Sequence, residues 1–225
     1  MAIDIVQYLN EKQSEAGRAK KSGLPFITIS RETGCHSKMI AQLLQKEIQK
    51  LSNQKWRIVS KETIFEAVKD LEINPQQLNY VLDAAQKSHL EEILMAFGES
   101  RYKSYKAVRK TLMDTIGSFA AEGNNIIIGR AGALITAGIR AGIHIRLTAS
   151  RDWRTKSIST QHGISQDAAA LFVDETDEKR RKLFKDFSGN DPDNSLFDLV
   201  INNERISDED AVQLIIKLME QRKCW

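Results

Sequence analysis

The sequence predicts an α/β fold, a three-layer sandwich in which a five-stranded parallel sheet lies between layers of helices. Five short apolar or β-branched runs alternate along the chain with segments whose apolar residues recur at helical spacing. Right-handed crossovers between parallel strands place such helices on both faces of the sheet. The chain has 225 residues, 41% of them apolar, which is enough for one substantial core but short for two full domains. We therefore expect a single domain over residues 1–225.

The first strand leads through a turn into a helix. Residues 26–30, Phe-Ile-Thr-Ile-Ser, form a β-rich run, and Gly34 follows within a polar turn. From Met39 to Leu51, apolar residues repeat at helical spacing. This order places backbone N–H groups and a helix N-terminus around one point, where they can hold a phosphate. Upstream, residues 3–16 have an amphipathic pattern that predicts a short helix ahead of the domain.

The next region changes from strand to helix. Residues 56–59 predict a short second strand. Residues 61–122 are almost free of strand signals, and their apolar residues follow helical patterns, most clearly at 78–94 and 108–119. We expect this region to be a helical insertion.

Two further strands and a long charged segment follow the insertion. The compact runs at residues 124–128 and 143–147 predict strands three and four, because buried parallel strands consist of nearly continuous apolar and β-branched residues. Residues 150–187 are charged and helical in pattern, with Ser165 as a helix start. The turn-forming run at residues 188–192 ends this segment.

The chain closes with a fifth strand, at residues 198–201, and a helix. Ser207 and Asp210 form a capping-box pattern, with Asp in place of the more usual Glu, just before the helix. Apolar residues from Val212 to Met219 supply the buried face of this helix.

Ligands of open parallel sheets bind beyond the carboxyl ends of the strands. This rule selects residues 31–38 after the first strand, Gly129 and Arg130 after the third, and residues 150–154 after the fourth. All three segments contain arginine or lysine. The first of them matches the phosphate-loop pattern GxxxxGK[ST] weakly, because it keeps only Gly34 and ends in Lys38. An ordinary strand-to-helix turn is the alternative interpretation.

Composition narrows the class of protein. The 33 basic residues exceed the 30 acidic ones by only 3, so we expect no nucleic-acid partner. Cys35 and Cys224 form no CxxC or Cys/His cluster, and the sequence indicates neither a disulfide framework nor a metal site. No apolar run approaches the length of roughly 20 residues that crosses a bilayer, so we expect a cytoplasmic protein without a membrane partner.

Four segments together resemble the cytidylate kinase-like family, in order and spacing, over roughly residues 25–216. They are FITISRETGCHSKMIAQLL, NNIIIGRAGALI, DETDEKRRKLFKDFSG and NSLFDLVINN. The most specific pieces are ISRE, GRAG and the D-x-x-R-R of Asp177, Arg180 and Arg181, because they are polar and fall where the sheet places a ligand. The resemblance implies a P-loop nucleoside monophosphate kinase fold, in which residues 61–122 form the substrate-binding insertion and residues 151–190 a mobile lid.

The resemblance also implies an activity, the transfer of the terminal phosphoryl group of ATP to CMP or dCMP with Mg²⁺. Such a transfer needs positioning and charge neutralisation, which arginines around the phosphates can supply. The residues implied to bind the nucleotide phosphates are Arg31, Gly34, Cys35, His36, Ser37, Lys38 and Arg154. Gly129 and Arg130 are implied to bind the acceptor. Lys38, Arg180 and Arg181 are implied to be catalytic, with Asp177 orienting the lid.

The phosphate loop departs from the family pattern. Family members typically have a GSGGR-like run where this chain has Gly-Cys-His-Ser-Lys at residues 34–38, and true cytidylate kinases have GSGKG, so two glycine positions are lost. In an ungapped alignment the usual lysine position falls on Ser37, and the hydroxyl that would bind magnesium is missing.

These departures keep other interpretations open. One is a non-catalytic nucleotide-binding module, and another is a kinase for a different small acceptor. Asp177, Arg180 and Arg181 also fit a solvated helix face with ion pairs. A metal or thiol role for Cys35 and His36 is disfavoured, because no partner groups can be placed near them from the sequence.

Overall fold

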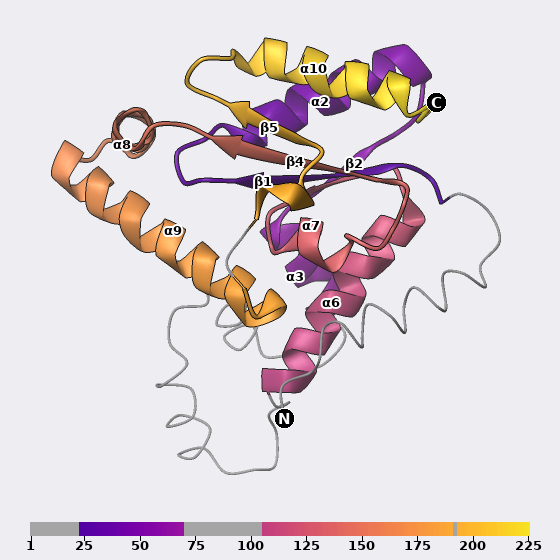
Figure 1. Ribbon diagram of the computed structural model, residues 1–225, viewed down its shortest axis with the longest axis horizontal. Coiled ribbons are helices and arrows are strands. Elements are labelled where there is room, and N and C mark those ends of the chain that lie inside the picture. The colour runs from indigo at the N-terminus through magenta and orange to yellow at the C-terminus, as the bar shows by residue number, and fades with distance from the viewer. Residues whose placement is uncertain (1–22, 70–104, 191–192) are drawn as a thin grey trace.

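The computed structural model describes residues 23–69, 105–190 and 193–225 (Figure 1). It contains a parallel sheet of five strands in the order β2-β3-β1-β4-β5, which confirms the predicted fold class. The strands are β1 (Phe26–Arg31), β2 (Arg57–Val59), β3 (Asn125–Ile128), β4 (Gly142–Thr148) and β5 (Leu199–Asn202). The helices are α2 (Ser37–Ser52), α3 (Lys61–Lys69), α6 (Tyr105–Glu122), α7 (Gly132–Ile135), α8 (Arg151–His162), α9 (Gln166–Ser188) and α10 (Asp208–Gln221), with a 3-10 turn η1 (Asn194–Leu196).

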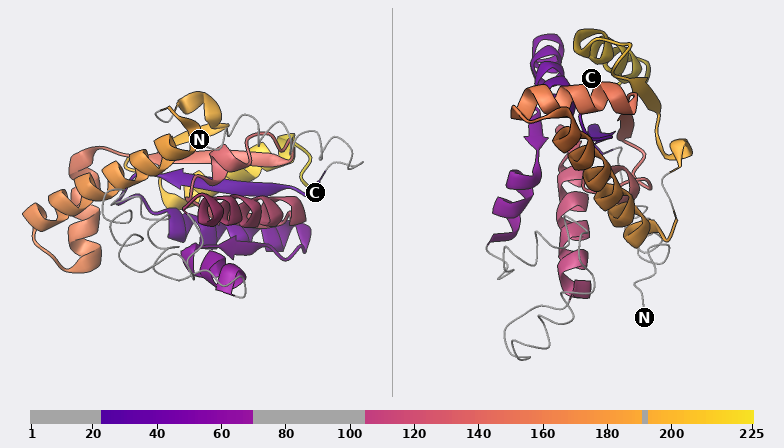
Figure 2. Two further views of the ribbon diagram at one scale, coloured as in Figure 1. Left: turned by 90° about the horizontal axis from the view of Figure 1, so that it is seen from below. Right: turned by 90° about the vertical axis from the view of Figure 1, so that its left-hand side faces the viewer.

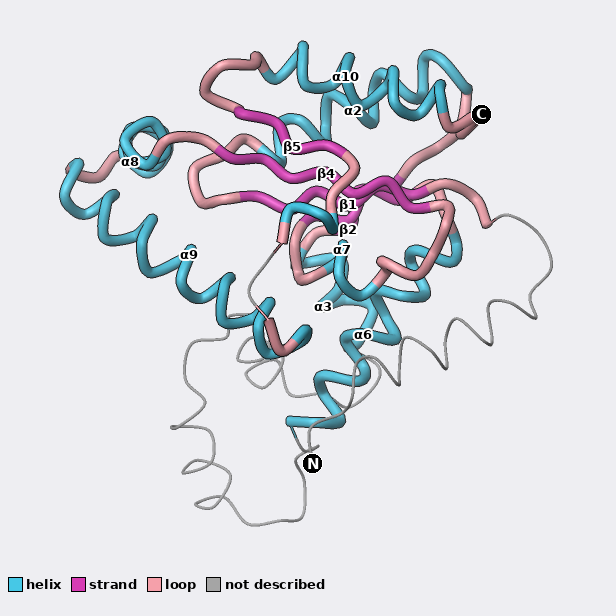
Figure 3. The backbone as a smooth tube through the Cα atoms, in the orientation of Figure 1, coloured by secondary structure: helices cyan, strands magenta, loops and turns pink. Residues whose placement is uncertain are grey.

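Helices cover both faces of the sheet. Helices α2 and α10 lie on one face, and α3, α6 and α7 lie on the other (Figures 1 and 3). Successive side chains of a strand point to opposite faces, so Phe26 packs into the cluster under α6 while Ile27 and Ile29 pack into the cluster under α2. Both clusters are fully apolar cores, and they hold β1 in the centre of the sheet.

Helices α8 and α9 pack against each other and lie across the end of the sheet where the strands finish (Figure 2). Their boundaries follow from local sequence. The Ser150 hydroxyl accepts a hydrogen bond from the first turn of α8, Gly163 ends α8 in the left-handed conformation, and the Ser165 hydroxyl caps α9 as predicted. At the far end of α9, Leu183 and Phe187 are buried in the core. Helix α9 is therefore anchored to the core of the domain at this end.

Most predicted elements are present with shifted ends. Helix α2 starts two residues before Met39, and Ser188 belongs to α9 rather than to the turn. The four-residue helix α7 and the turn η1 were not predicted, because each is too short to show periodicity.

Helix α6 falls inside the range predicted as an insertion, yet it packs against the sheet. The predicted helical patterns at residues 3–16 and 78–94 lie outside the described residues. Of the helices that the structure describes, none has both the length and the apolar composition needed to cross a membrane.

Candidate functional site

A cavity of about 400 Å³ lies beneath α9, at the carboxyl ends of β1, β3 and β4. We call it the arginine pocket, because five arginines line it. They are Arg31, Arg130, Arg146, Arg180 and Arg181. Glu32 and Asp177 are the acidic residues of the lining, and Leu183, Phe184 and Phe197 give it an apolar part. An anionic ligand with an apolar portion fits this lining.

Three of these arginines repel one another. Burial, together with the charges of Arg180 and Arg130, lowers the pKa of the Arg31 guanidinium well below its ordinary value. Burial also lowers the pKa of Arg180; the Asp177 carboxylate opposes this effect, and Arg130 adds to it. No carboxylate of the described residues forms an ion pair with Arg31. A bound anion would relieve this repulsion, and a phosphate offers the charge and the oxygen acceptors to do so.

The turn after β3 has an uncommon backbone. Gly129, Arg130 and Ala131 follow one another with φ values of 71°, 57° and 54°. A left-handed conformation is costly for residues other than glycine, and such strain concentrates at functional sites. A Cβ at position 129 would lie 1.8 Å from Nη1 of Arg31. The glycine of the GRAG segment therefore makes room for the Arg31 guanidinium.

A larger open groove, of about 910 Å³, lies between α8, α9 and the start of α2. We call it the loop groove, because the loop after β1 forms one of its walls. Among its lining residues are Gly34, Cys35, His36, Ser37 and Lys38 from the loop and α2, Trp153, Lys156 and Ser157 from α8, and Phe172 from α9. Arg31, Glu32 and Arg180 line both the loop groove and the arginine pocket. The two hollows therefore share a charged wall.

Residues of α8 and α9 hold the loop after β1 in place. The Thr33 backbone N–H and hydroxyl both donate to Oδ1 of Asp177, over 2.8 and 2.7 Å. Nη1 of Arg154 donates to the Thr33 carbonyl over 3.1 Å and to Oδ2 of Asp177 over 2.5 Å. A Cβ built on Gly34 would lie 2.6 Å from the carbonyl oxygen of Arg154, so α8 packs directly on the loop backbone. Asp177 and Arg154 brace this loop.

Other backbone N–H groups of the loop are also bonded within the protein. Cys35 donates to the carbonyl of Glu32 over 3.3 Å, and Ser37 donates to the carbonyl of Cys35 over 2.9 Å. The His36 N–H donates to Oδ1 of Asn203 over 2.8 Å. In this arrangement the N–H groups of Thr33, Cys35, His36 and Ser37 all donate to protein acceptors.

Comparison with known proteins assigns the family. The sequence model of the cytidylate kinase-like family matches residues 26–205. The chain belongs to the cytidylate kinase-like family. The matched range contains every lining residue of the arginine pocket, the turn of Gly129 and Arg130 included, and every lining residue of the loop groove except Asp208. No curated protein sequence matches the chain.

One solved structure supports the fold of this cytidylate kinase-like protein. An uncharacterized protein from Eubacterium ventriosum has a TM-score of 0.63 at 19% identity, covering 88% of this chain and 99% of that chain. A shikimate kinase from Bacteroides thetaiotaomicron has a TM-score of 0.47 at 12% identity, covering 87% and 98%. The Eubacterium ventriosum structure shows the fold alone, because its sequence identity to this chain is low.

The structure divides the residues implied by the cytidylate kinase-like resemblance into three groups. Arg31, Gly129, Arg130, Asp177, Arg180 and Arg181 line the arginine pocket, and Gly34, Cys35, His36, Ser37 and Lys38 line the loop groove. Arg154 is buried among the residues of the loop and lines neither hollow. Burial, followed by the charge of Glu32, raises the pKa of the Cys35 thiol to about 12. Cys35 is therefore a protonated thiol at neutral pH and a poor nucleophile.

Arg146, Phe184 and Phe197 were not predicted as lining residues from the sequence, and Glu32, which lies in the predicted segment 31–38, was given no role of its own. Glu32 accepts from the Thr148 hydroxyl over 2.7 Å and from the Ala149 N–H over 3.2 Å, which ties β1 to β4 at the pocket. Arg146 lies on β4 with its guanidinium 5.6 Å from the centre of the Phe197 ring. A charged residue near the end of an apolar strand was a usable signal for Arg146. Phe197 and Phe184 gave no comparable signal.

Proposed function

We propose that this chain transfers the γ-phosphoryl group of ATP to a nucleoside monophosphate, with CMP or dCMP as the acceptor. The observation that supports this proposal most strongly is the wall shared by the two hollows. Because Arg31 and Arg180 line both of them, these cations can contact an acceptor phosphate on one side and a donor phosphate on the other. Phosphoryl transfer depends mainly on this kind of positioning and charge neutralisation.

The proposed acceptor site is the arginine pocket. Arg130 and Arg31 bind the acceptor phosphate, and the lost repulsion between their guanidinium groups adds to the binding free energy. The sugar and base lie toward Leu183, Phe184 and Phe197. This arrangement fits a ligand with one phosphate end and one aromatic end, which is the shape of a nucleoside monophosphate.

The proposed donor site is the loop groove. Lys38 is exposed in the first turn of α2 and lines the groove, as does Arg180. Both cations can neutralise charge on the transferred group and on the leaving diphosphate. Arg154 acts as a positioning residue, because it holds the loop and lines neither hollow. Asp177 holds the same loop and also lines the arginine pocket.

Magnesium has no ready protein ligands at the described residues. No group of three His, Cys, Asp or Glu side chains suited to a metal is found among them. Oδ1 of Asp177 accepts from Thr33, its Oδ2 accepts from Arg154, and Oε2 of Glu32 accepts from Thr148 and Ala149. Magnesium commonly binds through substrate phosphates and water, and nucleotide-bound magnesium needs few protein ligands. Magnesium would therefore enter the site bound to the phosphates of the nucleotide.

The loop geometry favours one second candidate, a non-catalytic nucleotide-binding module. In a P-loop such N–H groups hold phosphates, but here those of Thr33, Cys35, His36 and Ser37 are bonded to Asp177, Asn203 and loop carbonyls. These four N–H groups therefore donate to the protein and not to a phosphate, which favours binding without transfer.

Steady-state assays separate the two candidates. Purified protein is mixed with ATP, magnesium and a panel of acceptors, with CMP and dCMP first, then other nucleoside monophosphates and small non-nucleotide acceptors. Turnover with CMP or dCMP is the expected result. If folded protein turns over no acceptor but binds ATP and CMP in calorimetry, the non-catalytic module is the better description.

A further inference from the structure

The loop groove contains an aromatic pair that phosphoryl transfer does not require. The rings of Trp153 and His36 lie with their centres 5.1 Å apart and their planes at 45°. Both residues line the groove, and Trp153 is only partly buried. The Trp153 indole therefore has a face available in a groove lined by cations. Such an indole is uncommon on a protein surface, because part of its apolar ring stays in contact with water.

The structure fixes the backbone of Trp153 and the ring of His36. Trp153 lies in the first turn of α8, where its backbone N–H donates to the Ser150 hydroxyl over 3.3 Å. Nδ1 of His36 lies 3.0 Å from Oδ2 of Asp208, and Nε2 of His36 lies 3.4 Å from the Ser157 hydroxyl. Contacts at both nitrogens therefore fix the imidazole, and the imidazole packs against the indole. A planar ligand would find this surface already formed.

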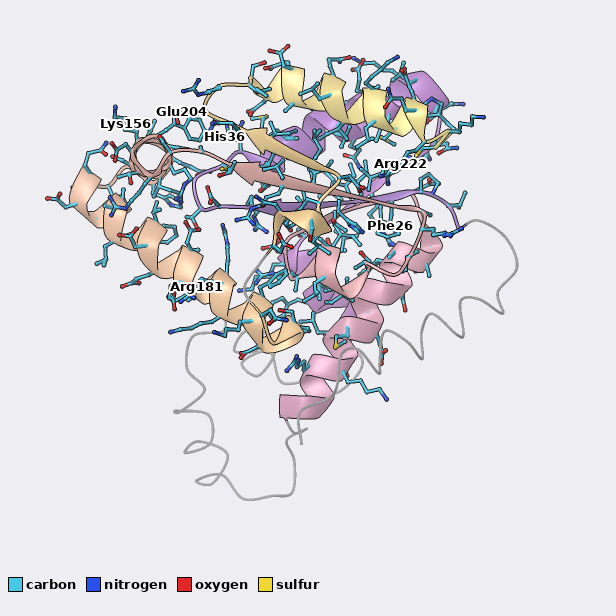
Figure 4. The ribbon with its side chains drawn as sticks, in the orientation of Figure 1. Phe26, His36, Lys156, Arg181, Glu204 and Arg222 are labelled. Atoms are coloured by element: carbon cyan, nitrogen blue, oxygen red, sulfur yellow. The ribbon has the colours of Figure 1, made fainter. Side chains whose placement is uncertain are left out.

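Cations line the same groove. Lys38 lies on α2, Lys156 lies one turn after Trp153 on α8, and Arg180 lies at the wall shared with the arginine pocket. Figure 4 shows His36 and Lys156 at the same end of the molecule, where the strands finish. The groove thus combines an aromatic surface with positive charges, and its volume of about 910 Å³ is within the range of pockets that hold ligands of nucleotide size.

We infer that the Trp153 indole is the stacking surface for the base of a purine nucleoside triphosphate, with the phosphates directed toward Lys38 and Arg180. This inference rests on the proposed function, since it places the donor in the loop groove. A purine has a larger ring area than a pyrimidine and gains more from stacking, so the site prefers ATP and GTP to CTP and UTP.

Tryptophan fluorescence tests the stacking. The chain has three tryptophans, Trp56, Trp153 and Trp225, of which Trp56 is buried in the core. ATP and ADP are expected to quench the emission of the wild-type protein, whereas inorganic tripolyphosphate, which has no base, is expected to bind without quenching. The quenching is expected to disappear in Trp153→Leu and to remain in Trp225→Leu, the matched control at an exposed site.

Affinity and kinetics provide the second measurement. Trp153→Leu is expected to weaken ATP binding about tenfold in calorimetry, while its affinity for tripolyphosphate stays unchanged. In turnover, the KM for ATP rises by a similar factor and kcat changes little, because stacking acts equally on the ground state and the transition state. Trp153→Phe keeps an aromatic face and is expected to restore most of the affinity, which separates stacking from a loss of folding.

The outcomes for this inference and for the proposed function differ. If Trp153→Leu binds ATP like the wild-type protein, or if ATP quenches the two leucine variants equally, Trp153 is not the stacking surface, even where turnover is observed. If the wild-type protein shows quenching by ATP but no turnover with any acceptor, the catalytic proposal fails and the stacking surface stands.

Discussion

The arginine pocket and the loop after β1 both adjoin the charged wall that the two hollows share, but their polar groups interact in opposite ways. In the pocket, Arg31, Arg130 and Arg180 repel one another. In the loop, the charged and polar groups satisfy each other, with Asp177 accepting three hydrogen bonds from Thr33 and Arg154. The repelling arginines of the pocket favour a ligand that supplies negative charge, whereas the loop is already bonded to a carboxylate, that of Asp177 on α9.

This difference separates function from stability. Groups that repel one another in the free protein lower its stability and raise its affinity for an anion. Groups that form hydrogen bonds and ion pairs with one another stabilise the fold and have less capacity left to bind a ligand. Substitutions on the two sides of the wall should therefore change stability in opposite directions.

The largest effect is expected for Arg31→Met. Activity, as kcat/KM for the acceptor, should fall about 100-fold or more, because a phosphate-binding charge is lost. The free energy of unfolding should stay the same or rise, because a mutually repelling charge is removed and the Arg31 carbonyl still accepts from Arg180. Acceptor kinetics and urea denaturation measure the two quantities.

Arg140→Met is the control for this experiment. Arg140 is exposed and lines neither hollow, so the same change of side chain there should leave both activity and stability within error. A clear loss of stability in Arg31→Met would show that the guanidinium contributes to the fold and would contradict the comparison.

An intermediate effect is expected for Asp177→Asn, on the loop side. The change keeps the shape of the side chain but leaves the buried Arg154 guanidinium without its nearest full charge. Unfolding should become easier by about 1–3 kcal/mol, measured by urea denaturation. Asp174→Asn on the same helix is the matched control, since its ion pair with Arg151 is exposed and screened by solvent and should contribute little to stability. Equal losses in the two variants would refute the bracing role.

The smallest effect concerns a group that lines neither hollow. His144 is buried in β4, 2.8 Å from the Thr28 hydroxyl, and burial lowers its pKa; the nearby Asp198 opposes this effect and Arg222 adds to it. The unfolded chain therefore binds the proton more readily than the folded one. The stability that this group contributes is fully present above about pH 6.5 and is lost as the pH falls through the lower pKa of the folded state.

His144→Asn should flatten this dependence. The free energy of unfolding, measured by urea denaturation between pH 8 and pH 5, should vary less with pH than in the wild-type protein. His162→Asn, at an exposed position of α8, should leave the curve unchanged. If the pH dependence is the same in His144→Asn as in the wild-type protein, groups other than His144 cause it.

Much of the arrangement was predictable from the sequence because it depends on local pattern. Apolar runs of strand length indicated all five strands, and the rule that ligands bind at the carboxyl ends of parallel strands selected Arg31, Gly129 and Arg130. The motif of Asp177 and Arg180 was found through its resemblance to a family. Each of these signals is contained within a few neighbouring residues.

The contacts of Asp177 show where such signals end. The sequence shows an aspartate three residues before Arg180 on a helix, which fits an ion pair on a solvated face. Only the packing of α9 across the sheet places its carboxylate on Thr33, 144 residues away in sequence. Trp153 is a similar case, because its ring contact with His36 joins α8 to the residue just before α2.

The sequence by itself determined the α/β class, the position of each strand and the set of arginines at the carboxyl ends, because periodicity and strand order depend on neighbouring residues. Tertiary structure alone decided which of those polar groups pair with each other and which face a cavity. Pairing depends on distances between elements far apart in the chain, and no local pattern encodes them. For that reason Arg154, expected at a phosphate, lies buried behind the loop, while Arg31 faces the pocket.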